Sequence, residues 1–277
     1  MWGPSTACPA LPWLPAPRAQ PALALAPAGG ALLCGGRDFD GVHQDCLQLG
    51  AGAANWTYHS RLVVARAGAA MVRAGGTLYL VGGAGAGQVS EHLGPGDRWA
   101  VGPAVLPGGA GEVAGHCLLP YRGDSFLLLG GLTDGVASGR VHLYNTTTAG
   151  WAEWPGMGRA RSQHACAWVE GGILVAGGLG GAAVSTEFLH LESMEWGEAG
   201  ALVEAREAGR LAVLPDITGH SAFMLGGHSR AEGHSLASVE VQVEGGWEKV
   251  EVGMVERRAE HAAAHVPYSF CSGGRLL

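Results

Sequence analysis

The sequence contains little charge and very little of the side-chain chemistry that contacts nucleic acid. Charged residues make up 15% of the 277 residues, the formal net charge is −7, and Lys249 is the only lysine. A nucleic-acid groove needs clustered Lys and Arg against the phosphates, so this class of partner is excluded. No segment reaches the roughly 18 to 20 apolar residues of a membrane helix, and we expect no membrane contact.

Sequence features that direct a chain to a compartment are also scarce. Residues 1–27 lack the basic start and unbroken apolar stretch of a signal peptide, so a cytoplasmic location is the default expectation. The two asparagines, Asn55 and Asn145, both stand in N-x-Thr sequons, which leaves an extracellular location open. The alternative is that Asn and Thr are simply favoured turn residues before a strand.

Cysteine is sparse for a chain of this length. Small secreted scaffolds depend on dense disulfides, whereas this chain is long enough to form its own core. We therefore expect buried thiols at all six positions, which are Cys8, Cys34, Cys46, Cys117, Cys166 and Cys271.

Glycine is abundant, with 48 residues, and its placement is periodic. A pair of glycines ends a short apolar run once every 47 to 49 residues, which is the length of one propeller blade. Short runs of this kind, bounded by turn residues, predict buried strands. The six pairs are Gly35-Gly36, Gly82-Gly83, Gly130-Gly131, Gly177-Gly178, Gly226-Gly227 and Gly273-Gly274.

Two more landmarks recur in a fixed order within this unit. A tryptophan follows each of the first five glycine pairs, and an arginine comes ten residues after four of these tryptophans. An alternating stretch before the tryptophan indicates a third, half-exposed strand, so each unit should hold four strands. These landmarks are Trp56, Trp99, Trp151, Trp196 and Trp247, with Arg66, Arg161, Arg206 and Arg257.

This order of landmarks resembles the kelch repeat of β-propeller proteins, over nearly the whole chain. The resemblance implies one all-β domain over residues 1–277: a six-bladed kelch-type propeller with four-stranded antiparallel blades and a last blade closed by both termini. Trp13 would supply the fourth strand of that blade. No region resembles the BTB and BACK segments of kelch adaptors. The expected blades are residues 18–65, 66–110, 111–159, 160–205, 206–256, and 257–277 with 1–17.

The resemblance also suggests where a ligand would bind. In kelch proteins that bind peptides, the residue after each diglycine and the loop beyond it line one face, as does the second residue after the repeat arginine. The expected binding residues are Arg37, Asp38, Asp40, His43, Asp134, Gln163, His228, Arg230 and Arg275. The same rules add Ala84, Leu132, Leu179, Gly68, Ala208 and Ala259.

We therefore expect a monomeric, non-catalytic scaffold or adaptor that binds another protein. Arg37, His228, Arg230 and Arg275 would form a basic arc for an acidic or phosphorylated peptide; the alternative is scattered solvated residues. The repeat arginines should be structural, pairing between blades.

The other function considered is a sugar-handling enzyme, because a bacterial sialic-acid mutarotase is also a six-bladed kelch-type propeller. Such an enzyme needs acid and base groups across a central pocket. The candidate carboxylates are Glu112, Asp134 and Glu207, although exposed loop carboxylates are usually just solvated. An enzyme should show converging carboxylates with perturbed pKa values in the channel, and a binder a broad open face.

No metal or cofactor is expected. His116, His164 and His261 recur one per blade, which spreads them around the ring, so we expect them to be structural and hydrogen-bonded. The iron pattern of plant specifier proteins fails because Ala264 follows Glu256 and Glu260 where a histidine is required. No set of tyrosines, histidines and cysteine matches the copper site of galactose oxidase.

Overall fold

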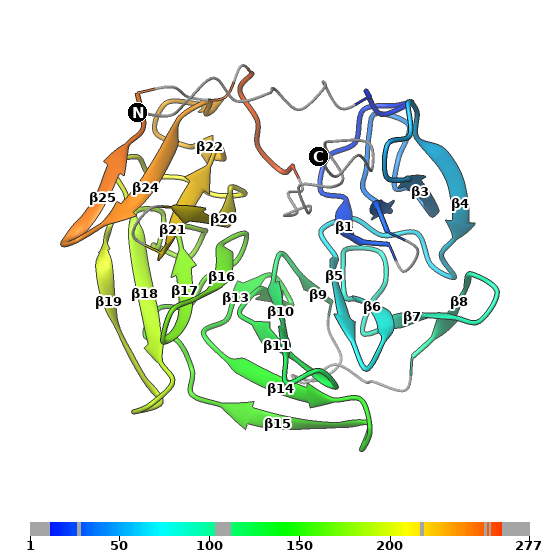
Figure 1. The fold of residues 1–277 in the computed structure, drawn as a ribbon, viewed down its shortest axis with the longest axis horizontal. Helices are drawn as coiled ribbons and strands as arrows, with labels where there is room; N and C mark the ends of the chain where they lie inside the picture. Colours follow the sequence, from blue (N-terminus) through cyan, green and yellow to red (C-terminus); the bar gives the residue numbers. More distant parts are fainter. Residues whose placement is uncertain are drawn as a thin grey trace, which may run out of the picture.

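The computed structural model describes residues 12–26, 29–102, 112–216, 219–251, 254 and 256–261, and these residues form strands and turns without any helix. No helix among them could span a membrane. Five four-stranded antiparallel sheets are arranged around a centre (Figure 1). The all-β propeller architecture predicted from the repeat is therefore confirmed.

Each sheet is one blade, and its strands follow one another from the centre outwards. Blade 1 holds β1 (Ala22–Leu25), β2 (Ala31–Cys34), β3 (Asp45–Leu49) and β4 (Thr57–Arg61). Blade 2 holds β5 (Ala70–Ala74), β6 (Thr77–Val81), β7 (Glu91–Gly94) and β8 (Arg98–Val101). Blade 3 holds β10 (Cys117–Tyr121), β11 (Ser125–Leu129), β14 (Val141–Asn145) and β15 (Gly150–Trp154).

Blades 4 and 5 repeat the same order. Blade 4 holds β16 (Ala165–Val169), β17 (Gly172–Ala176), β18 (Ser185–His190) and β19 (Glu195–Ala201). Blade 5 holds β20 (Arg210–Asp216), β21 (Gly219–Leu225), β24 (Val239–Val243) and β25 (Gly246–Lys249). Two-residue strands add small sheets: β9 (Val113–Ala114), β12 (Leu132–Thr133), β13 (Val136–Ala137), β22 (His228–Ser229) and β23 (His234–Ser235).

A closed ring of six backbone hydrogen bonds joins the blades around the centre. Each N–H in the ring donates to the carbonyl of the preceding member, and Gln20 N–H completes the ring by donating to Glu260 at 2.8 Å. Glu260 belongs to the segment predicted to open the sixth blade, whose expected first two strands and both chain ends lie outside the described residues. Six blades and closure by both termini stay predictions. The members are Gln20, Gly68, Gly115, Gln163, Ala208 and Glu260.

The diglycines are required because neighbouring backbone passes very close to them. Gly82 has φ 63° and Gly83 has φ 100°, a region that glycine adopts without steric cost. A Cβ on Gly82 would lie 2.2 Å from the carbonyl oxygen of Val113, in the next blade. The repeat therefore marks the points where one blade contacts the next; Gly273 and Gly274 lie outside the described residues.

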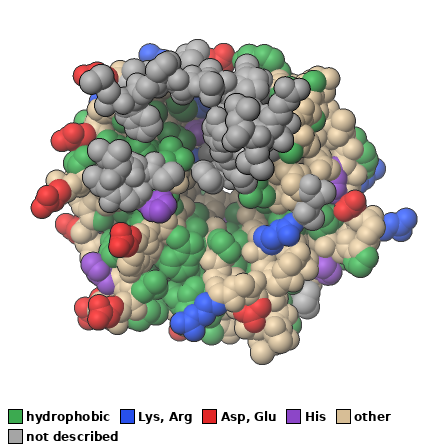
Figure 2. All heavy atoms as spheres, in the orientation of Figure 1, with side chains coloured by type: hydrophobic (Ala, Val, Ile, Leu, Met, Phe, Trp, Pro, Cys, Tyr) green, Lys and Arg blue, Asp and Glu red, His purple; other side chains and the backbone are tan. Residues whose placement is uncertain are grey.

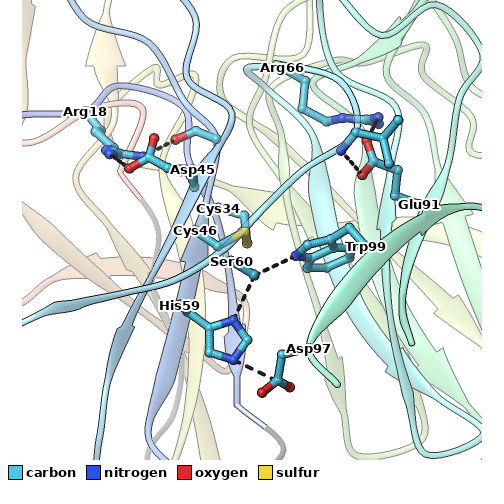
Figure 3. Close-up of a disulfide and its surroundings, with 12 residues drawn as sticks. Arg18, Cys34, Asp45, Cys46, His59, Ser60, Arg66, Glu91, Asp97 and Trp99 are labelled. Atoms are coloured by element: carbon cyan, nitrogen blue, oxygen red, sulfur yellow. Dashed lines mark hydrogen bonds and ion pairs between the residues drawn. A yellow bond between two sulfur atoms is a disulfide. The ribbon is translucent and has the colours of Figure 1, made fainter. Parts of the chain in front are cut away.

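Three of the repeat arginines, Arg66, Arg161 and Arg206, form buried ion pairs inside their own blades. Arg66 donates to the carbonyls of Gly82 at 2.8 Å and Val89 at 2.7 Å, and it pairs with Glu91 (Figure 3). Pairing between blades was the expectation, and it is wrong, because the guanidinium turns inwards to its own third strand. The equivalent pairs are Arg18–Asp45, Arg161–Glu187 and Arg206–Glu240.

Two members of the predicted pattern differ from the rest. Arg257 is exposed, and the backbone of Arg258 instead accepts the hydrogen bond from Gly227 that other repeat arginines accept. Trp13 is 79% exposed and outside any strand, so it does not fill a wedge between blades. By contrast, Trp99 is buried and donates to Ser60 of blade 1, as a wedge between blades requires (Figure 3).

Blade 3 lacks the buried ion pair. Val113 occupies the place of the repeat arginine, because its carbonyl accepts from Gly83 as the Arg66 carbonyl does from Gly36. His142 lies opposite Leu128, the register that Glu91 has opposite Leu80. Both partners of the pair are thus replaced together, and a cavity of about 260 Å³ lies beside Val113 and His142.

The cysteine prediction is wrong for the four cysteines within the described residues. Cys34 and Cys46 face each other on β2 and β3 and form a disulfide (Figure 3). Cys117 on β10 and Cys166 on β16 form a second one, which joins blades 3 and 4. Chain length indicated that disulfides were unnecessary for folding, but the repeat places these cysteines side by side. Cys8 and Cys271 lie outside the described residues.

Candidate functional site

A cavity of about 440 Å³ lies at the centre of the ring, where the innermost strands of the five described blades begin. Figure 2 shows that this face of the molecule is hollowed near its middle. The wall is largely made of alanine and other small side chains, such as Ala67, Ala69 and Ala84, which leave the space open. This size suits a small ligand, since ligand pockets in proteins span roughly 300 to 1,000 Å³.

Polar groups enter the cavity from the ring of six backbone hydrogen bonds. All six members line it, and Gln20, Gln163 and Glu260 adopt left-handed φ values of 55°, 52° and 54°. Non-glycine residues in this region cost roughly 1 to 3 kcal/mol each and concentrate at functional sites. Three long polar side chains are thus held in a strained conformation around one cavity.

Glu260 forms a polar cluster with residues from the beginning of the chain. Gln20 Nε2 donates to Glu260 Oε1 at 2.7 Å, and Arg37 Nη2 approaches the same oxygen at 3.4 Å. The Glu260 side chain is 28% exposed, so it is in contact with solvent in the cavity. No described residue donates a hydrogen bond to Oε2, which leaves that oxygen available to a ligand.

Buried and partly buried basic groups line the cavity on blades 3, 4 and 5. Burial, together with the charges of Arg161, His116 and Arg210, holds the pKa of His164 well below its usual value, and burial lowers the pKa of His116 to about 4. Both rings are therefore neutral at pH 7. His164 is 3% exposed and neither ring nitrogen has a hydrogen-bond partner.

The expectation that these histidines are hydrogen-bonded structural groups is thus wrong for all three: the ring nitrogens of His116 are buried without partners, and so are those of His164 and His261. Both rings pack against the diglycine of the preceding blade: a Cβ on Gly130 would lie 2.9 Å from His164 Cε1, and one on Gly226 3.3 Å from His261 Cε1. Unpartnered buried polar atoms are costly, so those at a cavity wall need a partner in the cavity, which a water molecule or a ligand can supply. Of the two, His164 lines the central cavity.

Arg210, at the start of β20, also lines the cavity. Its one hydrogen bond to a described residue is to the carbonyl of adjacent Gly209. Burial lowers the pKa of Arg210, and the negative charge of Glu260 opposes that shift. An arginine with spare donors facing a cavity is suited to hold a carboxylate.

Of the predicted binding residues, the structure brings Arg37 and Gln163 to the cavity. Asp38 is used within its own loop, where it accepts from Asp40 N–H at 2.8 Å and contacts His43 Nε2 at 2.7 Å. Hydrogen bonds from Asp40, His43 and Gly41 lower the pKa of Asp38 against the raising effect of desolvation. These loop residues hold the turn rather than line the cavity.

The remaining predicted residues lie apart from it. Asp134 is exposed in the turn between β12 and β13, and Arg230 forms an ion pair with Glu207 at 2.8 Å. His228 is bridged through its backbone to Glu207 and is not part of the cavity lining. Arg275 lies outside the described residues, so the basic arc stays a prediction.

The spacing rules succeeded in part. Gly68, Ala208, Ala84 and Leu132 line the cavity, as expected. The prediction that Ala259 faces the channel was wrong by one residue, because Glu260 is the residue that does. Arg258, rather than Arg257, takes the place of the repeat arginine.

Sequence reasoning missed the groups that matter most here. The candidate carboxylates are outside the lining, since Glu112 accepts from Gly85 N–H at 2.9 Å and Glu207 pairs with Arg230. Counting two residues on from Arg18 and Arg258 would have found Gln20 and Glu260. Nothing in the sequence singled out Arg210. Among the described residues, no group of three or more His, Cys, Asp or Glu could hold a metal ion.

The fold and this central cavity define the class of protein, an all-β propeller with a small-ligand cavity in its channel. No family model and no curated protein matches the sequence. Among solved structures, that of YjhT is similar, with a TM-score of 0.69 and 16% sequence identity over 85% of this chain and 84% of that one. At this identity the likeness concerns the fold.

The likeness bears on the architecture, and a non-catalytic scaffold gains no support from it. Among the described residues, Glu260 is the one carboxylate that lines the channel, where it is joined by Arg37, Arg210 and two buried histidines rather than by a second carboxylate. The interpretation of the chain as a non-catalytic interaction module is therefore wrong. It was reached because the repeat pattern reveals the strands of the scaffold and not the residues facing its channel.

Proposed function

We propose that the chain is a sugar-handling enzyme that binds a sugar acid, of the sialic-acid class, in the central cavity and interconverts its anomers. The repeat landmarks support a kelch-type propeller as the scaffold. The observation that carries the proposal is the Glu260 carboxylate at the cavity, where Oε1 is held by Gln20 and Arg37 and Oε2 receives no hydrogen bond from any described residue.

Two arginines in the cavity lining favour a substrate that carries a negative charge. Arg37 and Arg210 both line the cavity, and the only carboxylate among the described lining residues is Glu260. A single carboxylate cannot neutralise two guanidinium groups, so an incoming anion gains charge-assisted hydrogen bonds. His164 and Gln163 on the same wall offer hydrogen bonds to hydroxyl or amide groups of the substrate.

Anomer interconversion requires a proton to leave the anomeric hydroxyl while the bond between the anomeric carbon and the ring oxygen breaks. Glu260 Oε2 accepts that proton, and the ring oxygen takes up a proton from water in the open cavity. Closure on the other face of the carbonyl reverses both transfers and yields the second anomer. Gln20 keeps Oε1 in place, which fixes the direction of Oε2.

The test follows the approach of a freshly dissolved single anomer of N-acetylneuraminic acid to equilibrium by proton NMR, with and without the protein. We expect faster equilibration with the native chain. Glu260→Gln keeps the shape of the side chain and removes the base, so kcat should fall by about 10²- to 10⁴-fold. Arg210→Gln should instead act mainly through KM.

Glu207→Gln is the matched control, because it removes the same charge outside the cavity, and it should leave the rate unchanged. Equilibration no faster than in buffer alone would overturn the proposal. So would a Glu260→Gln protein that retains the native fold and the native rate.

A further inference from the structure

The sequon Asn55-Trp56-Thr57 lies on the outer rim of the propeller, far along blade 1 from the central cavity. The residues precede and begin β4, which is the outermost strand of its sheet. Asn55 and Thr57 are exposed, and the Asn55 side chain forms no hydrogen bond to any described residue. Its amide nitrogen is thus free to carry a substituent in the folded protein.

Trp56, between them, holds the backbone in place. Its side chain packs against Leu23, Ala31 and Leu49 of the same blade. Its indole N–H donates to the carbonyl of Pro12 at 3.1 Å. Thr57 Oγ1 donates to the carbonyl of Gln48 at 3.4 Å, and Asn55 and Thr57 stay exposed on either side of the packed tryptophan.

The second sequon, Asn145-Thr146-Thr147, is built into the fold. Asn145 Nδ2 donates to Ser125 Oγ at 3.3 Å and to Asp124 Oδ2 at 3.4 Å, while its Oδ1 accepts from Thr147 N–H at 2.9 Å. The neighbouring Thr146 packs against Gly75 of blade 2. A bulky substituent on Asn145 would break this network at the contact between two blades.

The disulfides supply an independent observation about the compartment. Disulfides persist in oxidising compartments such as the secretory pathway, which is also where N-glycosylation takes place. Cys34–Cys46 lies within blade 1, and Cys117–Cys166 joins two blades. An exposed sequon on a chain with these bonds meets both requirements for glycan attachment.

We propose that the chain matures in an oxidising secretory compartment and carries one N-linked glycan, on Asn55. In this step a lipid-linked oligosaccharide diphosphate is the donor. The bond between its C1 and the diphosphate oxygen breaks, a bond from C1 to Asn55 Nδ2 forms, and one Nδ2 proton leaves. The glycan then covers the outer end of β4, an edge strand that would otherwise be free to pair with another chain. The central cavity stays open.

The test expresses the full chain with an added secretory leader in cultured eukaryotic cells and measures its mass before and after an amide-hydrolysing glycosidase. We expect one glycan, with Asn55 converted to aspartate in the digested peptide. Asn55→Gln and Thr57→Ala should abolish the mass shift. Thr57→Ser, which preserves the sequon, and Asn145→Gln, which removes the other one, should retain it.

Thiol alkylation before and after reduction of the secreted protein checks the second half of the proposal. Cys34, Cys46, Cys117 and Cys166 should react only after reduction. An unshifted native chain, a glycan that maps to Asn145, or cysteines that alkylate without reduction would each overturn the proposal. Translation in the presence of microsomes shows which sequon is glycosylated, even for a variant that folds too poorly to be secreted.

Discussion

The buried pair of Arg66 and Glu91 allows a sharp test of what holds a blade together. Both side chains are 0% exposed. Glu91 also accepts from the backbone N–H groups of Val63 at 2.7 Å and Val64 at 3.0 Å. One carboxylate thus connects the third strand of blade 2 to the segment that enters the blade from β4.

Replacing Glu91 by Gln keeps the volume but removes the charge and puts an amide N–H₂ group where an acceptor is needed. Arg66 is left charged and buried without its partner. Breaking a buried ion pair by removing one member costs about 3 to 5 kcal/mol. With about 2.1 cal/mol/K of unfolding entropy per residue, a 277-residue chain has an unfolding entropy of about 0.6 kcal/mol/K. The expected fall in Tm is therefore about 5 to 8 °C.

The assay is thermal unfolding followed by circular dichroism, with Glu198→Gln as the charge-matched control. Glu198 is 82% exposed and pairs with the half-exposed Arg159 at 3.2 Å. A surface pair contributes about 0 to 1 kcal/mol, so the control should shift Tm by less than about 2 °C. Equal shifts for the two variants would refute the reasoning that burial makes the Glu91 pair decisive.

Three further predictions concern other parts of the fold. Val113→Arg with His142→Glu should restore the missing pair of blade 3, so that a double-mutant cycle gives a favourable coupling of about 0.5 to 3 kcal/mol; additive effects would contradict this. The chain-entropy relation gives about 4 kcal/mol for Cys117–Cys166, which closes 49 residues, and about 3 kcal/mol for Cys34–Cys46, which closes 12. Replacing Cys117 and Cys166 by Ala should therefore lower Tm more than replacing Cys34 and Cys46 by Ala. The reverse order would contradict the chain-entropy reasoning. The folded-state pKa of His116, about 4, lies below the unfolded value of 6.5, so on acidification the unfolded chain takes up the proton first. This contribution of about 3 kcal/mol is present above pH 6.5 and lost as pH falls to about 4; His116→Leu should flatten Tm against pH in that window, whereas the exposed-site control His190→Leu should not.

Most of the scaffold could be predicted from the sequence because a repeat imposes the same local geometry five times over. An apolar run that ends in a diglycine predicted the second strand of every described blade, as in the strands that end just before Gly82 and Gly130. The disulfide between Cys117 and Cys166 joins adjacent innermost strands. Its separation of 49 residues is one more than the 48 between Gly115 and Gln163, so the two cysteines lie one position out of step in the repeat.

The central site could not be predicted in the same way. Its residues are the places where the repeat is broken: Gln20, Gln163 and Glu260 stand where other blades have Gly or Ala. A one-residue error at Arg257 was enough to hide Glu260. Gln20 and Glu260 are 240 residues apart, and no local pattern relates them.

The sequence by itself determined that one β unit is copied along the chain, since glycine placement and apolar runs depend on local backbone geometry and on burial of each strand. Only the tertiary structure decided which side chains face the common centre and which of them meet there. That choice depends on the closing of the ring, because a hydrogen bond from Gln20 to Glu260 forms only when the first and last described segments lie side by side.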